Sequence, residues 1–207
     1  MFFDDLARTA MWSFAHLLTG VRGIAGAALP EQPCVYFGNH VSHGDFALIW
    51  AVLPAAARAR TRPVAGADYW EKDPLRRYIG RRVVRAVLIE RERAKRNEDP
   101  IAQMAAVLQG GESLILFPEG TRNQSEAPLL PFKSGLYHLG RTLPGLPLVP
   151  AWIDNLHRVL PKGELIPVPL LCTVRFGAPL CVQPDESKDA FLARASTALL
   201  ALRGDPP

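Results

Sequence analysis

A short apolar run, a polar turn and a longer apolar run follow one another over residues 34–53, and this order constrains the fold most. The run 34–37 is too short for a helix and rich in β-formers, which predicts a buried strand. The run 46–53 is long enough for a helix, and Pro54 follows its end. The polar turn 39–45 is therefore expected to join a buried strand to a helix and to hold polar groups rigidly at the surface.

Strand-like and helix-like segments alternate along the rest of the chain. Strands are expected at 21–25, 34–37, 63–67, 82–89, 113–117, 148–153 and 171–176. Helices are expected at the N-terminus and at 44–53, part of 69–79, 100–109, 134–143 and 191–202. Residues 55–59 either prolong the helix 44–53 or begin a loop, and the proline-rich stretch 156–171 predicts a loop or an edge structure. The alternation predicts an α/β fold with a central, mostly parallel mixed sheet flanked by helices and preceded by an N-terminal amphipathic helix.

The length of 207 residues fits a single domain with a substantial core. We expect an N-terminal helix over 1–19, a core over 20–182, and a C-terminal helix and tail over 183–207. The three cysteines form no C-x-x-C pair, so we expect neither a disulfide framework nor a zinc site, and a reducing cytosolic setting fits best.

Two stretches bear on membrane contact. Residues 10–29 are interrupted by polar residues and glycines, so we expect no transmembrane helix, and two aspartates before the first basic residue argue against a signal peptide. The N-terminal segment has an aromatic-rich face, which suits either the membrane interface or packing on the core. We expect the protein to be peripheral or monotopic at the cytoplasmic face of the inner or plasma membrane.

Residues 72–96 hold ten basic and three acidic side chains, although the net charge of the chain is only +4. Such a stretch suits an anionic membrane face, a phosphorylated substrate, nucleic acid or a merely solvated surface. Few aromatic residues interleave with the charges and no nucleic-acid motif is present, so we expect no nucleic-acid partner.

The turn 39–45 carries a histidine and a carboxylate at a helix start. Ser42 can act as the N-cap, and Asp45 falls three residues later, as in a capping box. His40 then lies just outside the helix, with Asp45 able to fold back toward it. One interpretation is a purely structural cap, and the other is a histidine–carboxylate pair for proton transfer.

Further polar clusters follow the predicted strands, at the edge where α/β sheets usually bind ligands. Glu90 and Arg91 follow the strand 82–89. Lys133 lies at a helix start, where exposed N–H groups suit an anion. A third cluster follows the strand 113–117 and consists of Glu119, Gly120, Thr121 and Arg122. Each of these clusters also has a structural explanation, but their joint placement favours a functional edge.

Four motifs resemble those of glycerophosphate and lysophosphatidate acyltransferases. The first is Asn39-His40-x-Ser42-x-x-Asp45, and the strongest is the block from Phe117 to Arg122, with sequence FPEGTR. Val149-Pro150-Ala151 matches a third block, and the segment ending in Arg91 is similar to a fourth, although Arg85 stands where the family often has glycine. Two more segments, 132–135 and 175–179, also look familiar, and the resemblance covers about residues 20–182.

The resemblance implies transfer of a fatty acyl group from a thioester to the free hydroxyl of lysophosphatidate or a related lysophospholipid. His40 is expected to be the general base and Asp45 its partner, so that no acyl-enzyme forms. Arg91, Arg122 and Lys133 are expected to hold the acceptor phosphate. Glu119 and Gly120 are expected to shape the pocket, and Glu119 to contact the acceptor as well. Thr121 is expected among the substrate-binding residues.

The other expected partners are the membrane surface and an acyl donor, which is acyl-CoA or acyl carrier protein, and no cofactor is required. Phe46, Leu48, Ile49, Trp50 and the stretch 156–171 are candidate walls for the acyl chain. Alternatives are another acceptor, such as glycerol phosphate or a lyso-aminolipid, and a non-catalytic membrane-surface module that binds phosphate. By the pattern of the family, His43 is expected to be a bystander. A metal site built from His40, His43 and Asp45 is the alternative, but the spacing offers no clear set of further ligands.

Overall fold

The computed structural model describes residues 2–42, 44–92, 94, 98–154 and 172–204. Within these residues, seven strands form one sheet in the order β1-β7-β6-β2-β5-β3-β4. Their bounds are β1 Arg22–Ala25, β2 Val35–Gly38, β3 Thr61–Gly66, β4 Val87–Ile89, β5 Ser113–Leu116, β6 Leu148–Asp154 and β7 Thr173–Phe176. All neighbouring pairs are parallel except β6 with β7, which confirms the predicted mixed and mostly parallel sheet.

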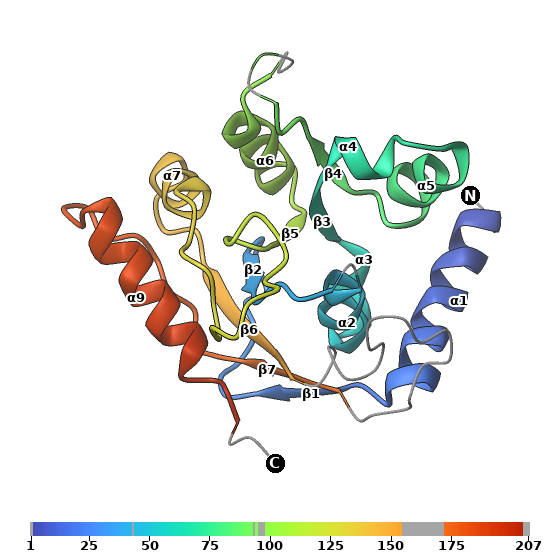
Figure 1. Cartoon of the computed structure of the whole chain (residues 1–207), viewed down its shortest axis with the longest axis horizontal. Coiled ribbons are helices and arrows are strands. Elements are labelled where there is room, and N and C mark those ends of the chain that lie inside the picture. The colour runs from blue at the N-terminus through green and yellow to red at the C-terminus, as the bar shows by residue number, and fades with distance from the viewer. Residues whose placement is uncertain (1, 43, 93, 95–97, 155–171, 205–207) are drawn as a thin grey trace.

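Helices cover both faces of this sheet (Figure 1). On one face lie α1 and α2, and on the other lie α6, α7 and α9. The helix bounds are α1 Phe2–Thr19, α2 Asp45–Val52, α3 Ala55–Ala59, α4 Ala67–Trp70, α5 Pro74–Tyr78, α6 Pro100–Gln109, α7 Gly135–Thr142 and α9 Lys188–Leu200, with a π-helix, η1, at Ile79–Val83. Residues 55–59 thus form a helix of their own after Pro54.

The central strand β2 and the residue before it, Cys34, supply both hydrophobic cores by simple alternation. Cys34 and Tyr36 pack under α1 and α2, whereas Val35 and Phe37 pack under α6, α7 and α9. All four side chains are fully or almost fully buried, because helices cover both faces of the sheet. The apolar run that predicted this strand is therefore continuous, as expected for a strand buried on both sides.

Helix α6 shows why the local signals predicted its bounds. Asp99 is the N-cap, and its carboxylate accepts the N–H of Ile101. Pro100 occupies the first turn, where it lacks only an N–H that would have no partner in the helix. The helix ends at Gln109, before Gly110, so the prediction of 100–109 is confirmed.

The predicted strand 82–89 is wrong in its first half. Ile79–Val83 forms η1, and only Val87–Ile89 pairs with β3. Between them Arg85 has a φ of 53°, a left-handed conformation that no other non-glycine residue in the described part of the chain adopts. This conformation breaks the strand, and it is one that glycine adopts more readily than arginine.

Five parallel strands, β2 to β6, point the same way, so their carboxyl ends meet at one edge of the sheet. The residues that follow β2, β4 and β5 are His40, Arg91 and Glu119. No helix in the described part of the chain is long and apolar enough to cross a membrane. The division into 1–19, 20–182 and 183–207 stays a prediction.

Candidate active site

The turn after β2 begins with Asn39, whose side chain continues the pairing of β2 with β6 after the main chain has left the sheet. Its Nδ2 donates to the carbonyl oxygen of Ile153 at 3.0 Å, and its Oδ1 accepts the N–H of Ile153 at 2.8 Å. Asn39 is buried, so these two bonds also satisfy the polar groups of its amide. The side chain thereby fixes the point from which the turn departs.

The next residue, His40, forms a close pair with Asp45. The ring Nδ1 of His40 lies 2.7 Å from Oδ2 of Asp45. The same oxygen accepts the main-chain N–H groups of Val41 at 2.7 Å and Ser42 at 2.9 Å. Because a carboxylate oxygen only accepts hydrogen bonds, Nδ1 carries the proton and Nε2 is left as the basic nitrogen.

The predicted capping box is half right. Asp45 does reach back to the N–H of Ser42, but Gly44 is the N-cap of α2, and Ser42 Oγ accepts the N–H of Gly44 at 3.2 Å. The helix therefore starts two residues later than a Ser42 cap requires. The carboxylate of Asp45 holds the turn and the imidazole together.

Asp45 is fully buried, and its second oxygen, Oδ1, has no hydrogen-bond partner in the described part of the chain. Burial raises the pKa of the Asp45 carboxyl, while the bonds from His40, Ser42 and Val41 oppose that shift. A buried carboxylate of this kind is costly for stability but orients a histidine tightly and stabilises its protonated form.

Glu119 holds the same turn from behind. Its Oε1 accepts the main-chain N–H of His40 at 2.7 Å, and its Oε2 accepts the N–H of Leu130 at 2.7 Å. Glu119 is buried, and burial raises the pKa of its carboxyl, while the two main-chain bonds lower it in part. With both oxygens engaged by the main chain, Glu119 lies behind His40 rather than in the lining of the neighbouring cavity.

Two further contacts fix His40. Its ring stacks on Phe117, with centroids 4.4 Å apart and an angle of 15° between the planes. Its carbonyl oxygen accepts the N–H of Asn123 at 2.6 Å. No described residue contacts Nε2 through a hydrogen bond, and the His40 side chain is 16% exposed, so this nitrogen is accessible to a substrate.

A cavity of about 830 Å³, here called the active-site cavity, lies next to His40. Its apolar lining includes Phe46, Trp70, Ile89, Ile101, Met104 and Leu116. Its basic lining consists of Arg91, Arg122, Lys133 and His138. The size and the combination of an apolar wall with a few convergent charged groups suit an amphipathic ligand.

The glycine of the FPEGTR block makes room for one of these cations. Gly120 has a φ of 70°, and a Cβ there would lie 2.7 Å from Cδ of Lys133. Gly66, at the end of β3, plays the same part for Arg91, whose Nε would lie 2.6 Å from an added Cβ. Side chains at these glycines would displace the cations that line the cavity.

The structure brings all the predicted site residues to one edge of the sheet. His40, Arg91, Gly120, Thr121, Arg122 and Lys133 line the active-site cavity, whereas Asp45 and Glu119 support His40. Arg91 lies 3.8 Å from Asp68, and neither Arg122 nor Lys133 forms an ion pair with any described residue.

Sequence reasoning misplaced most of the candidate acyl walls. Phe46 lines the active-site cavity, but Leu48 and Ile49 are buried in the core between α2 and the sheet. Trp50 lines a different cavity. The stretch 156–171 and His43 lie outside the described residues. Among the residues that are described, no group of acidic, histidine or cysteine side chains is arranged to hold a metal ion.

Sequence reasoning also missed contributors. Phe117 is a stacking partner for the base, Asn39 anchors the turn, and His138 adds a fourth basic side chain to the cavity. Asn39 and Phe117 belong to the first motif and to the FPEGTR block, but no local signal in the sequence predicts what their side chains contact. His138 had no sequence signal apart from its position in the first turn of a helix next to Lys133.

The fold and the site define an α/β protein with a histidine–carboxylate pair and a cationic cavity at the carboxyl edge of its sheet. A family model described as Acyltransferase matches residues 22–154, which include every one of these site residues. The chain therefore belongs to the acyltransferase family.

Named relatives agree with this assignment. A protein from Cocos nucifera named 1-acyl-sn-glycerol-3-phosphate acyltransferase is 30% identical over 180 residues, which is 84% of this chain and 53% of the relative. A Haemophilus influenzae protein of the same name is 28% identical over 130 residues, which is 59% of this chain and 48% of the relative. The chain thus spans about half the length of these relatives.

A solved structure shares the fold. The crystal structure of the 1-acyl-sn-glycerophosphate (LPA) acyltransferase PlsC from Thermotoga maritima matches 94% of this chain and 78% of its own chain, with a TM-score of 0.70. The sequence identity is 20%, so this likeness concerns the fold alone.

Proposed function

We propose that this chain transfers a fatty acyl group from an acyl thioester to the free hydroxyl of lysophosphatidate or a closely related lysophospholipid. The observation that carries the proposal is the His40–Asp45 pair, whose free ring nitrogen faces a cavity lined by Arg91, Arg122 and Lys133. A non-catalytic module that binds phosphate needs the cations but not the buried pair. The names of the relatives support the choice of acceptor.

The proposed reaction is a direct transfer with His40 as general base. Nε2 of His40 removes the proton of the acceptor hydroxyl as its oxygen attacks the thioester carbonyl carbon. Asp45 keeps the proton on Nδ1 and stabilises the imidazolium that forms. The tetrahedral intermediate then expels the thiolate, which takes the proton from Nε2, so the ester and the free thiol are the products.

No protein nucleophile is needed in this scheme. Cys34 is fully buried on the strand before the turn, and burial raises the pKa of its thiol. A buried thiol of this kind is a poor nucleophile, because the thiolate is the reactive form. Serine and threonine hydroxyls that line the active-site cavity have no histidine–carboxylate pair of their own among the described contacts.

The phosphate of the acceptor is proposed to bind Arg122 and Lys133, with Arg91 as a third cation in the lining of the cavity. Arg122 and Lys133 have no acidic partner in the described part of the chain, so a phosphate does not have to displace one. The guanidinium of Arg122 suits two phosphate oxygens at once. The apolar lining that includes Trp70 and Met104 is proposed to hold the acyl chain.

Attachment to a membrane surface through α1 belongs to the same proposal. Four large apolar side chains of this helix are more than half exposed, at Phe3, Leu6, Phe14 and Leu17. Their spacing places them on one side of the helix, as in helices that lie in the membrane interface. A lipid acceptor resides in the bilayer, so such attachment would bring the active-site cavity to its substrate.

The test is acyl transfer from radiolabelled acyl-CoA or acyl carrier protein to a panel of acceptors. The panel includes lysophosphatidate, glycerol phosphate and a lyso-aminolipid. Wild-type protein should acylate lysophosphatidate best, and His40→Ala should lower kcat by about 10² to 10⁴-fold with an unchanged fold. His16→Ala, which removes a histidine outside the active-site cavity, is the matched control. Wild-type turnover in His40→Ala would exclude His40 as the base.

A further inference from the structure

A second cavity, of about 450 Å³, lies at the opposite edge of the sheet from His40. We call it the arginine cavity, because Arg8, Arg58 and Arg85 line it. Thr61, the first residue of β3, lines the arginine cavity, whereas residues 63–66 of the same strand line the active-site cavity. A ligand in one cavity therefore leaves the other free.

The arginine cavity carries an excess of positive charge. Among its described lining residues Asp5 is the one acidic side chain, and it already lies 3.3 Å from Nη1 of Arg8. Arg85 is paired with Glu112, which lies beside the cavity rather than in its lining. Asp5 and Glu112 thus pair with Arg8 and Arg85, whereas Arg58 has no carboxylate partner among the described residues. The cavity therefore keeps an unpaired guanidinium, which suits an anionic ligand.

Arg58 keeps donors for such a ligand. Its Nη1 donates to the carbonyl oxygens of Ala51 and Leu53, at 3.3 Å each. Its guanidinium lies 5.1 Å from the ring centre of Trp12 and 5.5 Å from that of Trp50. Its Nε and Nη2 have no hydrogen-bond partner within the described residues, and no described carboxylate pairs with it.

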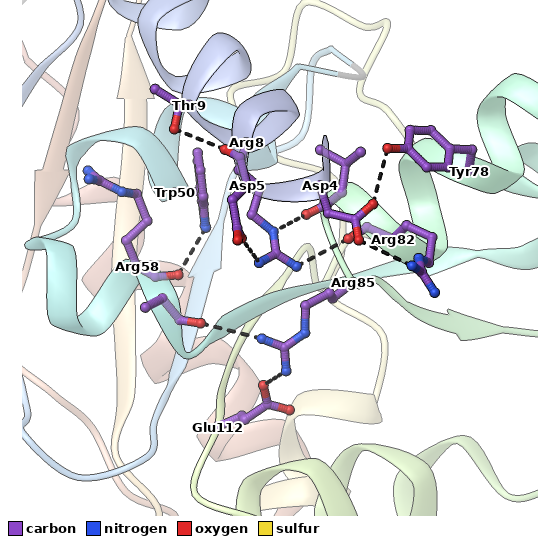
Figure 2. A network of polar contacts seen from close by, with 12 residues as sticks. Asp4, Asp5, Arg8, Thr9, Trp50, Arg58, Tyr78, Arg82, Arg85 and Glu112 are labelled. Atoms are coloured by element: carbon purple, nitrogen blue, oxygen red, sulfur yellow. Dashed lines mark hydrogen bonds and ion pairs between the residues drawn. The ribbon is translucent and has the colours of Figure 1, made fainter. Parts of the chain in front are cut away.

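Arg8 is held rigidly beside this space, as Figure 2 shows. Its Nε donates to the carbonyl oxygen of Val83 at 2.7 Å, and its Nη2 donates to that of Arg82 at 3.1 Å. Arg85 extends from the segment before β4 toward Glu112 and donates to the carbonyl oxygen of Ala59 at 3.5 Å. Cations that are already ordered lose little entropy when they bind a ligand.

We propose that the arginine cavity binds the phosphate group of a small organic phosphate. Arginine forks match phosphate oxygens, and a phosphate that binds Arg58 does not have to displace a carboxylate of the described residues. The cavity is larger than a phosphate, and Trp12, Trp50, Val83 and Val84 give it apolar walls for the adjoining organic part. This site goes beyond the proposed acyl transfer, because no residue of the active-site cavity takes part in it.

Indole NMR can separate the two cavities, because the four tryptophans report on different places. Trp12 and Trp50 line the arginine cavity, Trp70 lines the active-site cavity, and Trp152 is buried in the core away from both. Pyrophosphate titrated into full-length protein labelled with ¹⁵N in the indoles should shift the Trp12 and Trp50 signals saturably. Trp152 should not respond.

Arg58→Gln should weaken the response of Trp12 and Trp50 at least about tenfold, because it removes a charged donor pair. Arg85→Gln is the second variant in case Arg58→Gln fails to fold. Arg141→Gln, an exposed arginine outside both cavities, is the matched control and should leave the response unchanged. A response equal in wild type and both cavity variants would overturn the proposal.

The source of the phosphate is tested with vesicles of phosphatidylcholine, with and without phosphatidate. A shift of Trp12 and Trp50 that requires phosphatidate and is lost in Arg58→Gln assigns the cavity to a lipid headgroup. A shift with pyrophosphate and none with phosphatidate vesicles assigns it to soluble phosphates. The absence of both shifts, or a shift confined to Trp70, refutes the site. The acyl-transfer assay and the Trp70 response test the proposed function separately.

Discussion

The carboxylate of Glu119 accepts the main-chain N–H of His40 at 2.7 Å, although 79 positions separate the two residues. The same carboxylate also accepts the N–H of Leu130. Through Glu119, which does not line the active-site cavity, the FPEGTR block therefore supports the turn that carries the proposed base. The resemblance alone suggested an acceptor contact for Glu119, and we propose instead that it positions His40.

Glu119→Gln separates these two roles. The glutamine amide can accept only one of the two N–H groups, so the turn should loosen and kcat should fall, while KM for lysophosphatidate changes little. The lost bond should also lower the free energy of unfolding by about 1–3 kcal/mol. Steady-state kinetics measures the split, with Asp99→Asn as the control, because Asp99 lines the cavity without contacting His40. A raised KM with unchanged kcat would support the acceptor contact.

Arg122→Gln tests the phosphate contact. Loss of a charged donor to phosphate should raise KM for lysophosphatidate about tenfold to a hundredfold, with a smaller change in kcat. An acceptor without a phosphate should be affected far less, because it gains nothing from the cation. Arg141→Gln removes an equal charge outside the cavity and should behave as wild type. An unchanged KM in Arg122→Gln would mean that this arginine has only a structural role.

The buried carboxyl of Glu119 should make the free energy of unfolding fall as pH rises, which is the opposite of what a carboxyl with a lowered pKa does. Its pKa is raised above 4.5 in the folded state, so the folded protein holds this proton more tightly than the unfolded chain. The free energy of unfolding of wild type relative to Glu119→Gln should therefore fall as pH rises from 4.5 through the raised pKa, and then level off. Urea unfolding of both proteins from acid to neutral pH measures the difference. A relative stability that rises with pH would contradict the raised pKa.

The exposed face of α1 is testable by vesicle flotation. Leu17 is 87% exposed, so Leu17→Glu should leave the fold intact. Loss of its burial in the interface should weaken vesicle binding by about tenfold or more. Ala193→Glu places the same charge on an exposed position of α9 and is the matched control. Equal binding of wild type and Leu17→Glu would argue that α1 is not the attachment face.

Much of the fold could be predicted from local patterns. The apolar run at 34–37 required a strand buried on both faces, and Asp99, Pro100 and Gly110 marked the ends of α6. The same reasoning was wrong at 82–89. The valines there fit a strand by composition, but the left-handed conformation of Arg85 and the π-helix before it depend on how this segment meets α1 and β3.

The sequence by itself determined which side chains reach the carboxyl edge of the sheet, because parallel strands place the residues that follow them at that edge. The tertiary structure decided what those side chains contact. Glu119 accepts the N–H of His40 because β5 lies beside β2. Asn39 forms hydrogen bonds with Ile153 because β6 lies on the other side of β2. Strand order is set by long-range packing, which local periodicity does not encode. The arginine cavity arises in the same way, where α1 meets segments that lie far from it in the sequence.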